Sequence, residues 1–159
     1  MKRLLLMRHA KSDYPAGVDD HDRPLNRRGR LAAPLMGAYL KEIDAVPDLA
    51  IVSTASRARE TWARMRLRSD TSLNPALYHA NADVMLDVAR RARDEAETVL
   101  LLTHQPGVRD AANRLIGAHE VHQFPTAQIV SLDLEISDWS ALAFGGAVLR
   151  DIAAPKSLV

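Results

Sequence analysis

Two histidine and two arginine side chains are placed where they could act together on an anion. Arg8 and His9 directly follow an apolar run, His104 closely follows another, and Arg57 lies one helical turn beyond Ser53, which ends a third. Arginine presents a permanently charged fork of donors that matches phosphate oxygens. A neutral imidazole attacks phosphorus when its second ring nitrogen donates a hydrogen bond that fixes the tautomer. The sequence has no cysteine, and it shows no P-loop pattern, so histidine is the best available nucleophile.

Three continuous apolar runs must position these side chains. Residues 4–7 (LLLM), 49–52 (LAIV) and 99–102 (VLLL) do not alternate with polar residues, which is typical of strands covered on both faces. In an open parallel sheet, ligands bind beyond the carboxyl ends of the strands. The two histidines and two arginines therefore belong to one rim of the predicted sheet.

Helical patterns separate the runs. Asn26 is a plausible cap for a helix with apolar residues at helical spacing, although Pro34 and Gly37 predict a kink or a late start. Further helices are expected over residues 55–68, after a cap at Asn81 or Asp83, and from Pro106 to Gly117. The apolar residues expected on the first helix are Leu31, Leu35, Tyr39, Leu40 and Ile43.

In the C-terminal part of the chain, alternating apolar and polar residues replace the continuous apolar runs. Residues 130–136 alternate between apolar and polar, as in a strand with one wetter face. A Gly145-Gly146 turn precedes a last predicted strand over residues 147–152. Strands alternating with helices and ending in a hairpin-like tail predict a three-layer α/β/α sandwich with a mainly parallel sheet. The length of 159 residues predicts a single domain over residues 1–159.

Several segments together resemble the histidine phosphatase superfamily, whose fold is phosphoglycerate-mutase-like. Residues 7–12 (MRHAKS) resemble its Arg-His signature, residues 53–61 (STASRARET) its second motif, and residues 103–106 (THQP) its second-histidine motif. Residues 22–29 (DRPLNRRG) and the short length resemble the SixA-type phosphohistidine phosphatase branch. The resemblance extends from the first strand to about residue 152.

The resemblance implies a role for each matching residue. His9 would be the nucleophile and would carry a transient phosphoryl group that water then removes. Arg8 and Arg57 would clamp the phosphoryl oxygens, and His104 would hold the same group and stabilise its transition-state charge. No cofactor or metal is implied.

Two further positions match the SixA-type branch near the phosphate. Arg23 matches a basic position, and Ser12 matches a hydroxyl on the loop after the nucleophile. Arg23 could equally belong to a solvated helix start, because four arginines occur between residues 23 and 30. Ala10 replaces the glycine that many members carry after the nucleophile, a change that the branch tolerates.

The middle of the chain offers no clear counterpart of the acidic proton donor that mutases and many phosphomonoesterases of the superfamily carry. Asp83 and Asp87 are the candidates, but both lie in a helical pattern where they could be a cap and a solvated face. An alkoxide leaving group needs a proton, whereas imidazole leaves phosphohistidine more easily. The missing acid favours a phosphohistidine or another labile P–N substrate over a sugar phosphate, and it counts against mutase activity.

Composition restricts the partners. Lys and Arg number 21 against 20 Asp and Glu, so a net charge of +1 gives no reason to expect a nucleic-acid or membrane partner. The lack of cysteine suits a reducing compartment, and no apolar run approaches a membrane span, so we expect a cytoplasmic domain. The His119–His122 pair lacks an obvious third metal ligand, and His21 and His79 are expected in exposed loops.

A phosphorylated protein is therefore the expected partner. Two alternatives remain open from the sequence: a phosphomonoesterase acting on a small phosphorylated substrate, and a module that binds phosphoproteins without turnover. An acid group in the pocket would favour the first. The complete set of His9, His104, Arg8 and Arg57 counts against the second, because a binding module needs no nucleophile.

Overall fold

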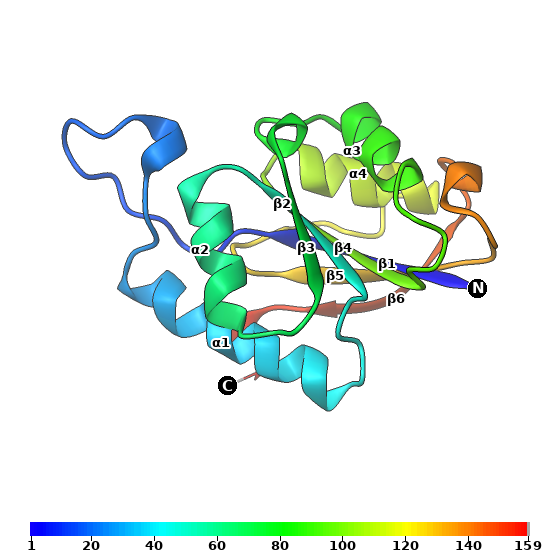
Figure 1. Cartoon of the computed structure of the whole chain (residues 1–159), viewed down its shortest axis with the longest axis horizontal. Helices are drawn as coiled ribbons and strands as arrows, with labels where there is room; N and C mark the ends of the chain where they lie inside the picture. Colours follow the sequence, from blue (N-terminus) through cyan, green and yellow to red (C-terminus); the bar gives the residue numbers. More distant parts are fainter. Residues whose placement is uncertain (159) are drawn as a thin grey trace.

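A six-stranded sheet forms the centre of the computed structural model, which describes residues 1–158 (Figure 1). The strand order is β3-β2-β4-β1-β5-β6. β5 runs antiparallel to both of its neighbours, while β1, β2, β3 and β4 are parallel. The strands are β1 (Lys2–Arg8), β2 (Leu49–Ser53), β3 (Asp70–Asn74), β4 (Thr98–Thr103), β5 (Ile129–Leu134) and β6 (Ala147–Ala153).

Two pairs of helices cover the two faces of the sheet, as Figure 1 shows. α1 (Arg27–Glu42) and α2 (Ser56–Met65) pack on one face, and α3 (Ala82–Arg90) and α4 (Gly107–Ile116) on the other. The predicted three-layer α/β/α sandwich with a mainly parallel sheet is therefore confirmed. Within the described residues, no helix combines the length and the apolar character needed to cross a membrane.

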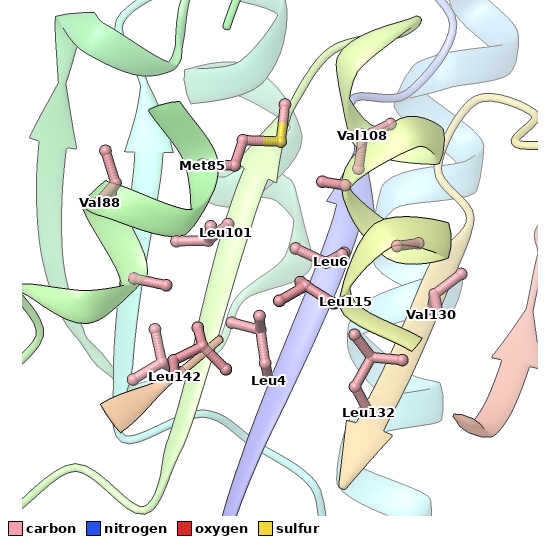
Figure 2. Close-up of a cluster of buried hydrophobic side chains, with 14 of the residues drawn as sticks. Leu4, Leu6, Met85, Val88, Leu101, Val108, Leu115, Val130, Leu132 and Leu142 are labelled. Carbon is pink, nitrogen blue, oxygen red and sulfur yellow. The ribbon is translucent and has the colours of Figure 1, made fainter. Parts of the chain in front are cut away.

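The continuous apolar runs are buried because both faces of their strands are covered. In β1, Leu4 and Leu6 pack toward α3 and α4, and this half of the core is shown in Figure 2. Leu5 and Met7 point the other way and pack in the cluster of α1 and α2. Burying each such side chain contributes about 1.5–3 kcal/mol, so the alternation ties both helical layers to the same strand.

The helix ends follow the predicted signals. Asn26 caps α1 by accepting a hydrogen bond from the Gly29 N–H at 3.0 Å. Asn81, rather than Asp83, caps α3 and accepts from the Val84 N–H at 2.9 Å. Gly117 ends α4 in the left-handed conformation, with φ of 82°, which glycine adopts without steric cost.

Two expectations about the first half of the chain are wrong. α1 is one continuous helix, and Leu31 on it is exposed while the small residues Ala33 and Gly37 are buried. The predicted helix over residues 55–68 ends at Met65, and an unpredicted strand, β3, follows it at the edge of the sheet. Four of the five residues of β3 are exposed, so this strand has no apolar pattern to reveal it.

Candidate active site

All six site residues predicted from the sequence line one pocket of about 220 Å³. The pocket lies at the carboxyl ends of β1, β2 and β4, where the parallel arrangement brings distant segments together. Its sequence-predicted residues are Arg8, His9, Ser12, Arg23, Arg57 and His104.

His9 is held by the backbone immediately beyond β1. Its N–H donates to the Thr103 carbonyl at 3.1 Å, which links β1 to β4 at the pocket. Its side-chain Nδ1 lies 2.7 Å from the Ala10 carbonyl, and a carbonyl can only accept, so Nδ1 carries the proton. The Nε2 atom of a neutral His9 ring then has a free lone pair.

Burial keeps the His9 ring uncharged. The side chain is almost fully enclosed, and burial lowers the pKa of His9 to about 4 against the opposing Ala10 hydrogen bond. The guanidinium charges of Arg57, Arg8 and Arg23 lower this pKa further. At neutral pH the imidazole is therefore in the form that can act as a nucleophile.

His104 lies against His9, with ring centroids 5.1 Å apart. Its Nε2 is 2.8 Å from the Ser53 hydroxyl, and that oxygen accepts from the Ala55 N–H at 3.3 Å. A hydroxyl oxygen can accept two hydrogen bonds and donate one, so the contact with Ser53 holds the His104 ring in place in either neutral tautomer. Burial and the neighbouring His9 lower the pKa of His104 to about 3. Nδ1 is buried and has no partner among the described residues.

Arg8 and Arg57 bring permanent positive charge to the two imidazoles. Arg8 is fixed by a hydrogen bond from Nη1 to the Phe124 carbonyl at 3.0 Å. Arg57 donates from Nη1 to the Asp20 carbonyl at 2.7 Å and from Nη2 to the Asp20 carboxylate at 3.1 Å. The Nε atoms of Arg8 and Arg57 are buried, and within residues 1–158 neither has a hydrogen-bond partner. Each guanidinium group can therefore donate a further hydrogen bond.

Asp20 is a pocket residue that sequence reasoning missed. Its carboxylate accepts hydrogen bonds from Tyr78 at 2.6 Å, Arg23 at 3.0 Å and Arg57 at 3.1 Å. The Tyr78 hydroxyl and the two guanidinium groups hold the pKa of Asp20 far below its ordinary value. The same Arg23 donates to the Ser12 hydroxyl at 2.8 Å. Asp20 therefore ties the arginines to the loop that follows β1.

His79 was expected in an exposed loop, and its side chain is 65% exposed. It nevertheless lines the pocket, with Nε2 3.6 Å from the Asp20 carboxylate. The two carboxylates considered as proton donors lie elsewhere. Asp83 pairs with Arg114 at 3.4 Å and Asp87 with Arg91 at 3.2 Å, and neither lines the pocket.

The arrangement can bind an oxyanion beside an uncharged imidazole. Guanidinium groups supply donors for the charge that develops on phosphoryl oxygens, the His104 ring lines the same pocket, and His9 Nε2 supplies an electron pair. These are the requirements of phosphoryl transfer through an enzyme-bound phosphohistidine.

Comparison with known proteins agrees with this chemistry. Residues 4–81 match the model of the histidine phosphatase superfamily, branch 1. An uncharacterized protein of Mycobacterium tuberculosis is 31% identical, with 94% of this chain and 100% of that protein covered.

Two solved structures are similar over nearly their whole length. The "putative phosphohistidine phosphatase SixA" of Nakamurella multipartitia is 28% identical with a TM-score of 0.89, covering 97% of this chain and 96% of that one. The Agrobacterium tumefaciens protein of the same description is 28% identical with a TM-score of 0.83, covering 97% and 99%. With these motifs, this fold and these relatives, the chain belongs to the histidine phosphatase superfamily and is a histidine-dependent phosphatase.

Proposed function

We propose that the enzyme hydrolyses phosphohistidine on a partner protein, through a phosphoryl group carried transiently on His9. The observation that carries this proposal is the state of the His9 ring. Nδ1 is bound to the Ala10 carbonyl, burial keeps the ring uncharged, and the ring lies in a pocket shared with Arg8 and Arg57. A nucleophile with a fixed tautomer among cationic donors is suited to attack on phosphorus.

In the first step, His9 Nε2 forms a bond to phosphorus as the bond from phosphorus to the substrate nitrogen breaks. The substrate imidazole takes a proton from solvent water on its other nitrogen and leaves as a neutral ring. Arg8 and Arg57 bind the phosphoryl oxygens. His104 carries its proton on Nδ1, which has no partner among the described residues, and donates it to one of these oxygens in a hydrogen bond. These donors are held in place before reaction, so they stabilise the transition-state charge without reorganising.

In the second step, water attacks phosphorus and the bond to His9 Nε2 breaks. Inorganic phosphate leaves, and His9 returns to the neutral ring with Nδ1 on the Ala10 carbonyl. Arg23 and Ser12, which touch each other at 2.8 Å, bind the phosphoryl group from the side of the loop after β1. The sum of the two steps is phosphohistidine plus water giving histidine plus phosphate.

The pocket favours a substrate that needs no carboxylic acid as proton donor. Among the lining residues that the structure describes, Asp20 has the one carboxylate side chain. The hydrogen bonds that it accepts from Tyr78, Arg23 and Arg57 keep this carboxylate ionised. An imidazole leaves more readily than an alkoxide. The names of the two similar solved structures support the same substrate class.

The test is a quench experiment on the wild-type enzyme with a labelled phosphoryl donor. A phosphohistidine peptide should leave label on the protein that is acid-labile, stable in base and lost on a chase with unlabelled peptide. Sugar and nucleotide phosphates should be turned over far more slowly. Faster turnover of those esters would favour a small-molecule phosphomonoesterase, and stoichiometric retention of the peptide without phosphate release would favour a binding module.

The low pKa of His9 predicts an unusual pH dependence. A protonated imidazole is not a nucleophile, so activity is lost only when the pH falls to about 4, the pKa of this group. We expect kcat/KM for an acid-stable aryl phosphate, corrected for its own ionisation, to stay level down to about pH 5. A loss centred near 6.5, the ordinary histidine value, would contradict this assignment.

A further inference from the structure

A second, larger hollow adjoins the catalytic pocket. Its volume is about 610 Å³, and it is bounded by the first turns of α1, the loop before β5, and the segment after β6. We call it the α1 groove. Lys11 and Thr126 line both the α1 groove and the catalytic pocket, so the two hollows are adjacent. The α1 groove is lined by Lys11, Arg28, Leu31, Ala32, Leu35, Gln123, Pro125, Thr126, Ala154, Pro155 and Lys156.

The α1 groove is lined by both apolar side chains and cations. Leu31 is 67% exposed, although it lies on a helix whose other face is packed in the core. Lys11, Arg28 and Lys156 are among the lining residues, which include no carboxylate side chain. In the part of the chain that the structure describes, none of these three cations forms a salt bridge.

We propose that the α1 groove binds the polypeptide segment that flanks the phosphorylated residue of the substrate protein. The segment carries apolar side chains for Leu31 and Leu35 and at least one carboxylate for the surrounding cations. This inference rests on the proposed function, and it adds the region of the enzyme that selects the protein substrate.

Three observations favour this occupant. The catalytic pocket, at about 220 Å³, has room for a phosphorylated side chain but not for the backbone that bears it. That backbone must leave the pocket, and the α1 groove adjoins its rim at Lys11 and Thr126. Cations that form no salt bridge among the described residues, beside the exposed Leu31, are complementary to an acidic, apolar peptide.

The decisive experiment compares two substrates and two variants. One substrate is a phosphohistidine peptide with leucine and glutamate on both flanks, and the other is free phosphohistidine. Leu31→Glu should lower kcat/KM for the peptide about tenfold and leave kcat/KM for free phosphohistidine unchanged. Val148→Glu is the matched control, because Val148 is 66% exposed and lies near the start of β6, at the other end of that strand from the groove residues that follow it, and it should change neither value.

Charge is tested separately. A peptide with lysine in place of each glutamate should be a poorer substrate for the wild type, and Arg28→Glu should reduce or reverse that preference. Equal turnover of both peptides, or equal losses for Leu31→Glu on the peptide and on free phosphohistidine, would overturn the docking proposal while leaving the proposed function intact.

Failure of the proposed function gives a different result. If no phosphohistidine compound is hydrolysed, fluorescence anisotropy of a labelled, unphosphorylated leucine–glutamate peptide still measures the binding of that peptide to the α1 groove. Binding weakened by Leu31→Glu and not by Val148→Glu would support docking without that chemistry, and no binding would overturn it. If sedimentation shows a wild-type dimer that Leu31→Glu converts to monomer, the groove is a contact between two copies and the peptide proposal is wrong.

Discussion

Replacing His9 with asparagine is expected to lower kcat for phosphohistidine hydrolysis by about 10⁴-fold or more, and to abolish the labelled phosphoenzyme. The asparagine side-chain amide can still donate to the Ala10 carbonyl, which His9 Nδ1 contacts at 2.7 Å in the wild type. The variant therefore keeps the local hydrogen bond and loses only the nitrogen that attacks phosphorus. Single-turnover kinetics with a labelled donor would measure both effects.

A histidine outside the pocket provides the control. His119 is exposed after the end of α4, and His119→Asn should leave both turnover and labelling unchanged. Near-ultraviolet circular dichroism of His9→Asn should match the wild type, which would separate lost chemistry from lost folding. Retention of more than a few per cent of turnover by a folded His9→Asn enzyme would exclude His9 as the nucleophile.

The sequence predicts that the site residues lie close together, because the order and direction of the strands determine where these residues lie. Arg8, His9 and His104 follow apolar runs, and those runs become neighbouring parallel strands with their carboxyl ends at one edge. Arg57 lies in the first turn of the helix after β2 and lines the pocket at the same edge. Each position is determined by a strong local signal and one general rule of parallel sheets.

Asp20 and His79 could not be predicted in this way. Asp20 lies in a short 3-10 turn, and it meets Arg57 only because of the path that the loop after β1 takes. His79 sits at a positive φ of 56° between an irregular turn and α3. Neither segment has a hydrophobic period, so nothing in the sequence indicates which side chains its conformation will place at the pocket.

The prediction for the buried face of α1 is right at Leu40 and wrong at Leu31, because small residues share that face with the large ones. Leu31 is exposed and Pro34 lies on the solvent side, while Gly37 is buried. Gly37 faces α2, where its backbone approaches the Met65 carbonyl group closely. Two helices this close need a residue without a side chain at the contact, so Gly37 marks a packing contact and not a kink.

Gly37→Ala should therefore destabilise the protein, against the ordinary preference of helices for alanine. A Cβ at this position would collide with the Met65 carbonyl oxygen and lie 2.9 Å from the Met65 carbonyl carbon, so α1 and α2 would have to separate. We expect a loss of about 2–3 kcal/mol in the free energy of unfolding, or about 5–10 °C in Tm. Ala38→Gly, at the exposed neighbouring position, measures the propensity difference alone and should cost about 1 kcal/mol. A Gly37→Ala protein that is more stable than the wild type would show that the two helices tolerate a side chain between them.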